Sequence, residues 1–167
     1  MANPKIEIIV KDFGTMTAEL YPGIAPVTVE NFLNLINEKF FDGLIFHRVI
    51  PGFMIQGGGF TEDFRQKHAD AITGEFAANG IKNDLRHERG VLSMARTNDP
   101  NSASSQFFVM HANAYYLDRN YAGFGKLTDG FDVLDKIATT PTGTRGFYMQ
   151  DVPMKNVVIE TIRLIEE

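Results

Sequence analysis

The chain has 167 residues, 44% of them hydrophobic, and a formal net charge of −5. This length and composition predict a single domain over residues 1–167 with a sizeable core, and the acidic balance argues against a nucleic-acid binder, which normally presents a basic face. Because there is no cysteine, disulfides, thiol nucleophiles and thiolate metal sites are excluded. No run approaches the roughly 18 consecutive apolar residues of a membrane span, and the N-terminal residues lack an apolar signal core, so we expect a cytoplasmic protein that does not bind membranes.

The first forty residues predict a hairpin and a helix. Apolar residues alternate over residues 5–10 and 15–21, which indicates two strands joined by a turn at residues 12–14. In the next segment apolar residues recur at i, i+3, i+4 and i+7, at Val29, Phe32, Leu33 and Ile36. This spacing is typical of an amphipathic helix, which we expect to begin near residues 26–28 and to fill the core rather than bind a cofactor.

Short strands and one more helix are predicted after residue 60. Residues 61–89 are polar with little periodicity, and we interpret them as a long irregular excursion of the kind that often lies near a site. Strand patterns follow over residues 91–95, 106–111, 122–127 and 157–165. Phe131, Leu134 and Ile137 indicate a second, shorter helix, and residues 139–154 are predicted to be a loop. Many short strands, two helices and no βαβ alternation indicate an all-β or α+β domain.

One cation, Arg48, lies in a strongly apolar stretch of the chain. If residues 44–50 and 53–56 are strands, the turn dipeptide Pro51-Gly52 between them can bring Arg48 and Gln56 to the same face. Burying a guanidinium costs several kcal/mol unless a partner meets it. Two interpretations are therefore open: a hairpin whose arginine pairs with a surface carboxylate, or an apolar patch that carries one fixed cation and one neutral amide.

The sequence lacks the common motifs of nucleophilic, metal-dependent and phosphate-binding enzymes. There is no Gly-x-Ser-x-Gly elbow, no His-Glu-x-x-His pair and no phosphate loop, and the four histidines are scattered along the chain. His47 and Arg48, as neighbours on a strand, should face opposite sides. We therefore expect neither a metal nor a cofactor, and no nucleophilic hydrolysis.

Four motifs together point to a known family. They are FHRVIPGFMIQGG at 46–58, GVLSMA at 90–95, SQFFV at 105–109 and FGK at 124–126. In their order and spacing they resemble the cyclophilin family of peptidyl-prolyl cis-trans isomerases, over about residues 6–164. The tail QDVP at 150–153, which leads into VVIE at 157–160, resembles the cytoplasmic bacterial branch. The resemblance implies a closed eight-stranded antiparallel β-barrel with a helix covering each open end, a packed interior and a site on an outer face.

The resemblance also implies roles for individual residues. Arg48 matches the family's catalytic cation, and Gln56 matches the amide that contacts the substrate backbone and orients that cation. The apolar proline pocket corresponds to Phe53, Met54, Phe108 and Leu117, although plain core is the ordinary interpretation of such residues without the motif. The groove for residues before proline corresponds to Ala95 and Gln106, with Arg96 beside them.

Three positions depart from the family pattern. Arg96 falls where many relatives have Asn, a change of little consequence if the position contributes through its backbone. Tyr116 stands where many relatives have a Trp that contacts cyclosporin, and Tyr121 where many have a His at the pocket wall. Because tyrosine still supplies aromatic surface and a hydroxyl, we expect turnover to survive and cyclosporin to bind more weakly than to Trp-bearing relatives.

Prolyl isomerisation suits this set of residues. An Xaa-Pro bond rotates over a barrier of ~18–20 kcal/mol, and the twisted prolyl nitrogen regains a lone pair that a fixed donor such as Arg48 can stabilise. The leading hypothesis is thus a monomeric isomerase acting on proline-containing peptides and partly folded proteins. The alternatives are a proline-binding chaperone module in which isomerisation is incidental, and a β-barrel carrier of a small ligand.

Overall fold

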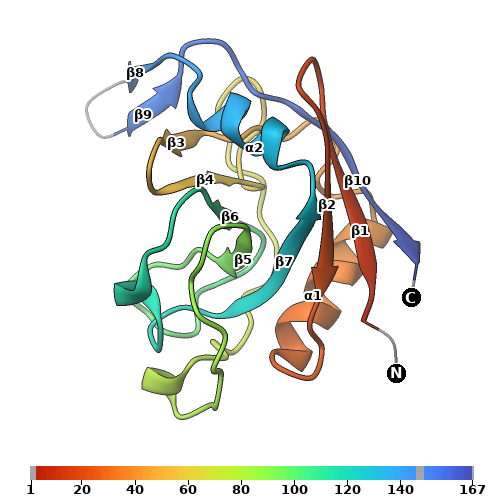
Figure 1. Ribbon diagram of the computed structural model, residues 1–167, viewed down its shortest axis with the longest axis vertical. Coiled ribbons are helices and arrows are strands. Elements are labelled where there is room, and N and C mark those ends of the chain that lie inside the picture. The colour runs from red at the N-terminus through yellow and green to blue at the C-terminus, as the bar shows by residue number, and fades with distance from the viewer. Residues whose placement is uncertain (1–2, 146–148, 167) are drawn as a thin grey trace.

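Eight antiparallel strands form one strongly curled sheet in the computed structural model, which describes residues 3–145 and 149–166 (Figure 1). The order across the sheet is β10-β1-β2-β7-β5-β6-β4-β3. The strands of this sheet are β1 (Lys5–Val10), β2 (Gly14–Leu20), β3 (Arg48–Ile50), β4 (Met54–Gly57), β5 (Val91–Met94), β6 (Phe107–Met110), β7 (Gly123–Asp129) and β10 (Ile159–Glu166). The mainly β fold that the sequence predicted is therefore confirmed.

The barrel is less closed than the family resemblance implied. Within the described residues, the edge strands β3 and β10 form no ladder with each other. Closure comes instead from the irregular segment before β3, where the Phe46 N–H donates to the Val157 carbonyl at 2.9 Å and the Ile159 N–H donates to the Leu44 carbonyl at 2.7 Å. β3 has only three residues, and isolated bridges at Ile45 to Phe60 and Val158 stand where a ladder would close the barrel.

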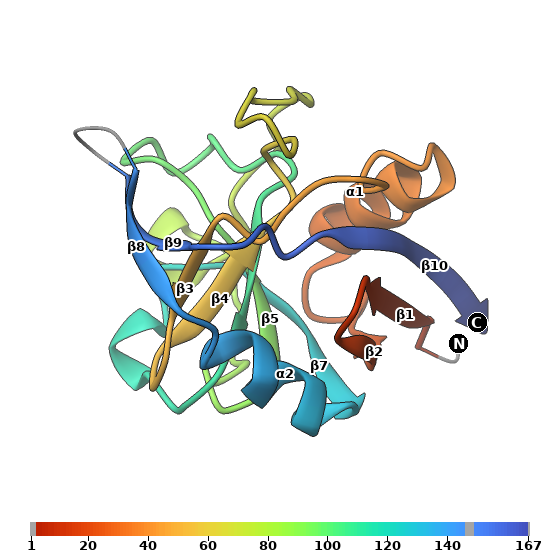
Figure 2. The ribbon, with the colours of Figure 1, turned by 90° about the horizontal axis from the view of Figure 1, so that it is seen from above.

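The two helices cover opposite ends of the curled sheet (Figures 1 and 2). Helix α1 (Pro26–Asn37) packs against β10 and α2 (Phe131–Ala138) packs against β2, β3 and β4. On α1 the predicted Leu33 is only half-buried, whereas Leu35 is buried. The N-terminus of α1 is capped from a distance: the buried Glu75 carboxylate accepts the Thr28 N–H at 2.6 Å, where the helix dipole favours negative charge.

The interior is filled by phenylalanine. Phe107 of β6 meets Phe32 edge-on at 5.3 Å between ring centroids, and the same ring packs against two further rings, Phe41 and Phe46. All four side chains are almost completely buried. A second, smaller cluster lies on the other face of β4–β6 and contains Met54, Val91, Phe108, Met110, Ala114 and Leu117. The sheet thus separates a packed core from a shallower apolar layer.

The long excursion is confirmed, but one predicted loop is wrong. Between residues 61 and 89 the only helical or strand element is the short 3₁₀ turn η1 (Ala77–Asn79). By contrast, residues 139–154 hold a second sheet of two strands, β8 (Thr142–Arg145) and β9 (Met149–Pro153). The sequence shows no alternation there because most of β8 is exposed on both faces. No helix in the described part of the chain is long and apolar enough to cross a bilayer.

Candidate active site

The β3–β4 hairpin brings the predicted cation and amide together. Its register pairs Arg48 with Gln56 and buries the alternate pair, Val49 and Ile55, against the core. The turn between the strands is tight, with Gly52 at a φ of +78° that favours glycine. Arg48 Nη1 donates to Gln56 Oε1 at 3.4 Å, so both polar groups lie side by side on the outer face of the sheet.

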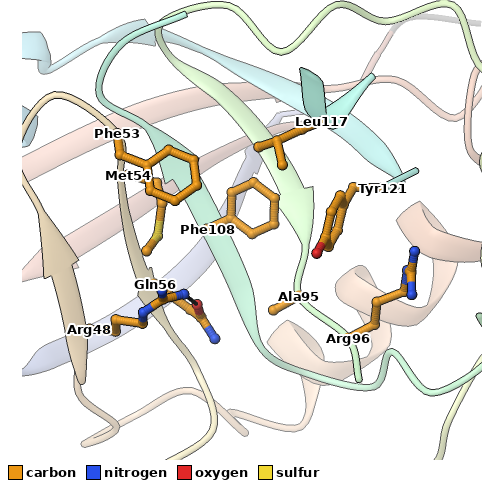
Figure 3. A pocket seen from close by; sticks show the side chains of 9 residues that line it. All are labelled: Arg48, Phe53, Met54, Gln56, Ala95, Arg96, Phe108, Leu117 and Tyr121. Carbon is orange, nitrogen blue, oxygen red and sulfur yellow. Dashed lines mark hydrogen bonds between the residues drawn. The ribbon is translucent and has the colours of Figure 1, made fainter. Parts of the chain in front are cut away.

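A small hollow opens beside this pair (Figure 3). Its volume is about 150 Å³, below the ~300–1,000 Å³ of pockets that bind drug-sized ligands, so it suits one side-chain ring rather than a whole molecule. The lining residues are Arg48, Phe53, Met54, Gln56, Ala95, Arg96, Phe108, Leu117 and Tyr121. We call this cavity the proline-sized hollow.

The two remaining predicted residues lie next to the hollow. Gln106 borders Gln56, and its Oε1 accepts a hydrogen bond from Gln56 Nε2 at 3.0 Å. Tyr116 is 71% exposed and stacks on Phe53, with 6.1 Å between the ring centroids. The structure therefore gathers every predicted site residue in one place, with these two at its rim.

Arg48 and Arg96 are the charged residues that line the hollow, and the two differ in their partners: the Arg96 guanidinium is hydrogen-bonded to backbone carbonyls, whereas Arg48 bonds only weakly to Gln56. The Arg48 side chain is exposed, and among residues 3–145 and 149–165 no carboxylate forms an ion pair with it. The interpretation in which Arg48 pairs with a surface carboxylate is therefore wrong. The N–H donors of the Arg48 guanidinium remain available to a ligand that covers the hollow.

His47 is buried whereas its neighbour Arg48 is exposed, and both border a second cavity beside β9. The imidazole is 8% exposed, lies 4.6 Å from the Phe60 ring, and has no hydrogen-bond partner for Nδ1 among the described residues. Burial, with the Arg48 charge adding to it, lowers the pKa of His47 to about 4. The side chain is therefore neutral at pH 7.

A buried hydrogen-bond chain behind the hollow was missed at the sequence level. His87 Nδ1 lies 2.9 Å from Asp118 Oδ1, and its Nε2 lies 2.8 Å from the Ser93 hydroxyl. Although the order of groups matches a hydrolase triad, Ser93 is completely buried and cannot reach a substrate. The ring instead stacks behind Phe108 at 6.1 Å, and burial lowers the pKa of His87 despite Asp118. The only sequence signal was that Ser93 lies inside a family motif.

Arg96 contributes through its side chain as well as its place in the chain. Its Nε and Nη2 donate to the Asn120 carbonyl at 3.1 and 2.7 Å, and Nη1 donates to the Thr97 carbonyl at 2.9 Å. The guanidinium also lies over the Phe76 and Tyr121 rings. Arg96 thus fixes the wall formed by residues 117–121, which the substitution for Asn did not suggest.

The acidic and histidine side chains are not arranged as a metal site in the described part of the chain. Across residues 3–145 and 149–166, no group of three or more His, Asp or Glu side chains is arranged to hold a metal ion. The hollow offers an apolar wall, the guanidinium groups of Arg48 and Arg96 and the amide of Gln56, with the amide of Gln106 at its rim. Such a set can bind a ring, hold a peptide backbone and stabilise a developing lone pair, without covalent chemistry.

Comparisons with known proteins agree with this chemistry. The family model described as cyclophilin type peptidyl-prolyl cis-trans isomerase/CLD matches residues 5–164. The chain is 43% identical over 169 residues to a peptidyl-prolyl cis-trans isomerase of Acinetobacter baylyi, covering 98% of this chain and 87% of that protein. It is 41% identical over 161 residues to peptidyl-prolyl cis-trans isomerase B of Escherichia coli, covering 92% and 95%.

Solved structures show the same relationship. A cyclophilin type peptidyl-prolyl cis-trans isomerase of Cryptosporidium parvum superposes with a TM-score of 0.81 at 28% identity, covering 99% of each chain. A second structure of that protein, determined in the presence of the dipeptide Ala-Pro, gives a TM-score of 0.79 at 29% identity, covering 98% of this chain and 99% of the other. With the family model, the relatives and the fold in agreement, the chain belongs to the cyclophilin-type peptidyl-prolyl cis-trans isomerases.

Proposed function

We propose that this isomerase uses the proline-sized hollow to catalyse rotation about Xaa-Pro bonds in peptides and partly folded proteins. The observation that carries the proposal is the position of Arg48, a cation without a carboxylate partner among the described residues, at the lip of an apolar cavity of about 150 Å³. The neighbouring cyclophilin structure determined in the presence of Ala-Pro supports a proline-containing ligand.

Arg48 acts on the prolyl nitrogen in this mechanism. Rotation breaks amide resonance, so the nitrogen becomes pyramidal and presents a lone pair that the planar ground state lacks. A donor aimed at this lone pair binds the twisted state more strongly than the planar state, which is the condition for catalysis. The Arg48 side chain is exposed, and a bound peptide would exclude water and strengthen its hydrogen bond to the prolyl nitrogen.

One hydrogen bond is not enough for the whole rate enhancement. A millionfold acceleration requires about 8 kcal/mol, whereas a charged hydrogen bond contributes about 1.5–3 kcal/mol net. The remainder comes from holding the proline ring between Phe53, Met54, Phe108 and Leu117, and from fixing the flanking backbone. The groove residues Ala95, Arg96 and Gln106 contact the chain before proline, and Tyr116 and Tyr121 border the ring.

Gln56 orients the catalytic cation. Its amide is fixed at both ends, since Oε1 accepts from Arg48 and Nε2 donates to Gln106. An amide fixed in this way cannot flip without losing both bonds. Gln56 therefore holds the guanidinium toward the hollow and leaves its other donors for the substrate.

Substitution of Arg48 tests the proposal against the proline-binding chaperone. In Arg48→Ala, kcat for a peptide substrate should fall roughly 10- to 150-fold, the equivalent of one charged hydrogen bond, while peptide affinity changes only a few-fold. Exchange NMR gives the isomerisation rate and titration gives the affinity. Arg65→Ala is the matched control because Arg65 is a surface arginine that does not line the hollow. Proportional losses of rate and affinity would favour a binding module instead.

The proposal also includes the cellular setting. We place the protein in the cytoplasm as a monomer, which cell fractionation and sedimentation test directly.

Cyclosporin is proposed as a weak ligand, because Tyr116 stands at the Trp position of many relatives. No metal or cofactor takes part in this mechanism.

A further inference from the structure

The turn that carries Phe53 is attached to helix α2 through one histidine. His111 follows β6, and its Nδ1 accepts the Gly52 N–H at 2.8 Å. On the other side of the ring, Nε2 lies 2.9 Å from Asp135 Oδ1 on α2. Because Nδ1 accepts a hydrogen bond, the ring proton belongs on Nε2, where it is donated to the carboxylate. The imidazole thus bridges the hairpin turn and the helix as a neutral tautomer.

The helix end of this bridge is held by Arg89. Arg89 Nη1 and Nη2 donate to the two Asp135 oxygens at 2.8 and 3.0 Å, a bidentate arrangement that fixes the carboxylate. The same Nη1 donates to the His111 carbonyl at 3.0 Å. Hydrogen bonding from Arg89 lowers the pKa of Asp135, which keeps the acceptor ionised. Neither the carboxylate nor the histidine backbone can move alone.

The other end of the bridge holds the turn of the hairpin, which carries Phe53. The His111 backbone N–H donates to the Phe53 carbonyl at 2.9 Å, while its ring accepts from Gly52. His111 therefore binds two consecutive residues of the turn, and Phe53 lines the hollow. The His111 side chain is mostly buried and is absent from the cavity lining, so it touches no substrate.

We propose that His111 is a positioning residue of the isomerase. Its imidazole fixes the turn, so that Phe53 is already placed at the wall of the hollow before a peptide binds. This inference rests on the proposed function of that hollow. Without the Gly52 bond the turn keeps the backbone hydrogen bonds of Phe53 but loses one attachment, so peptide binding must order it further and KM rises. Arg48 and Gln56 lie on the strands and keep their places, and a bound peptide returns Phe53 to the wall of the hollow, so kcat changes little.

Two substitutions separate the two ends of the bridge. The Oδ1 atom of asparagine can take the place of Nδ1, and the Nε2 atom of glutamine can take the place of Nε2. His111→Asn therefore keeps the acceptor for Gly52 and loses the contact with Asp135, whereas His111→Gln does the reverse. Each variant loses one hydrogen bond, so both should lose similar stability.

The peptide isomerisation assay distinguishes them. In His111→Gln we expect KM to rise about 3- to 10-fold, the equivalent of one net hydrogen bond, with kcat within about twofold of the parent. In His111→Asn, KM should stay within about twofold. Equal KM values in the two variants would overturn the inference, because a purely structural role would affect both alike.

If a variant does not fold, the hydrogen bond between Gly52 and His111 can still be tested in the unaltered chain. A scalar coupling between the Gly52 amide nitrogen and His111 Nδ1, detected by ¹⁵N NMR, is expected if the bond is present in solution, and its absence would contradict the inference. Arg48→Ala in the same assays keeps the two proposals apart. If Arg48→Ala lowers kcat and His111→Gln leaves KM unchanged, only the role of His111 fails. If Arg48→Ala has no effect on kcat, the proposed site itself fails.

Discussion

Two adjacent phenylalanines on β6 have opposite surroundings. Phe107 is completely buried and is met by the rings of Phe32, Phe41 and Phe46 on the inner side of the curled sheet. Phe108 is 5% exposed and lies on the outer side, with His87 behind it and one face toward the hollow. The inner ring is packed on every side, whereas the outer ring is held from behind and leaves room for a ligand. The site therefore occupies the face of the sheet on which packing is incomplete.

The neighbours His47 and Arg48 also have opposite surroundings. His47 is buried, neutral and without a partner for Nδ1 among the described residues, whereas Arg48 is exposed and charged. Burial keeps the His47 imidazole neutral, whereas the exposed Arg48 guanidinium keeps its charge available to a ligand.

The largest expected effect comes from truncating the two phenylalanines in turn. Phe107→Ala should lower the free energy of unfolding by roughly 3–5 kcal/mol, because it leaves a cavity in a closed core. Phe108→Ala should cost less stability, since the hollow already admits solvent, but should lower kcat/KM at least about tenfold. Urea denaturation and a peptide isomerisation assay measure the two quantities. Equal stability losses would show that the outer layer is core as well.

The next largest expected effect is a loss of stability at acidic pH, caused by protonation of His47 in the unfolded chain. The folded state holds this pKa near 4 whereas the unfolded value is about 6.5, so between these values the unfolded chain binds a proton that the folded chain does not. The contribution of His47 to the free energy of unfolding is fully present above pH 6.5 and is lost as the pH drops. Once the pH is below 4, the free energy of unfolding is lower by about 3 kcal/mol.

The control for this effect is His47→Gln, which cannot titrate. Its unfolding free energy should fall less steeply between pH 7 and pH 4, while the contributions of other groups cancel in the difference between the two proteins. Urea denaturation at several pH values gives both curves. Parallel curves would mean that His47 is protonated equally in both states, and that the contrast with Arg48 is not one of charge.

The smallest expected effect concerns the exposed rim. Tyr116 is 71% exposed, stacks on Phe53 and does not line the hollow, so Tyr116→Trp should leave the unfolding free energy within about 0.5 kcal/mol. The larger ring should raise cyclosporin affinity several-fold, by about 1 kcal/mol of aromatic contact. Titration calorimetry measures the affinity, and unchanged binding would mean that the weak affinity proposed here has another origin.

Local patterns in the sequence determined the elements and much of the site. The alternation of residues 5–10 and the helical spacing of residues 29–36 predicted β1 and α1, because burial of one face imposes a period on the chain. The turn at Pro51-Gly52 predicted that Arg48 and Gln56 share a face, and their register confirms it. The family resemblance then assigned Phe53, Met54, Phe108 and Leu117 to one pocket, and all four line the hollow.

Only the tertiary structure decided which contacts support these residues. The cap of Glu75 on α1, the stack of His87 behind Phe108 and the bridge from Gly52 to Asp135 join residues far apart in the sequence. The incomplete closure at β3 and the β8–β9 hairpin also depend on pairing between distant segments. A periodic pattern records which face of an element is buried, but not what it is buried against, and that partner is set by the path of the whole chain.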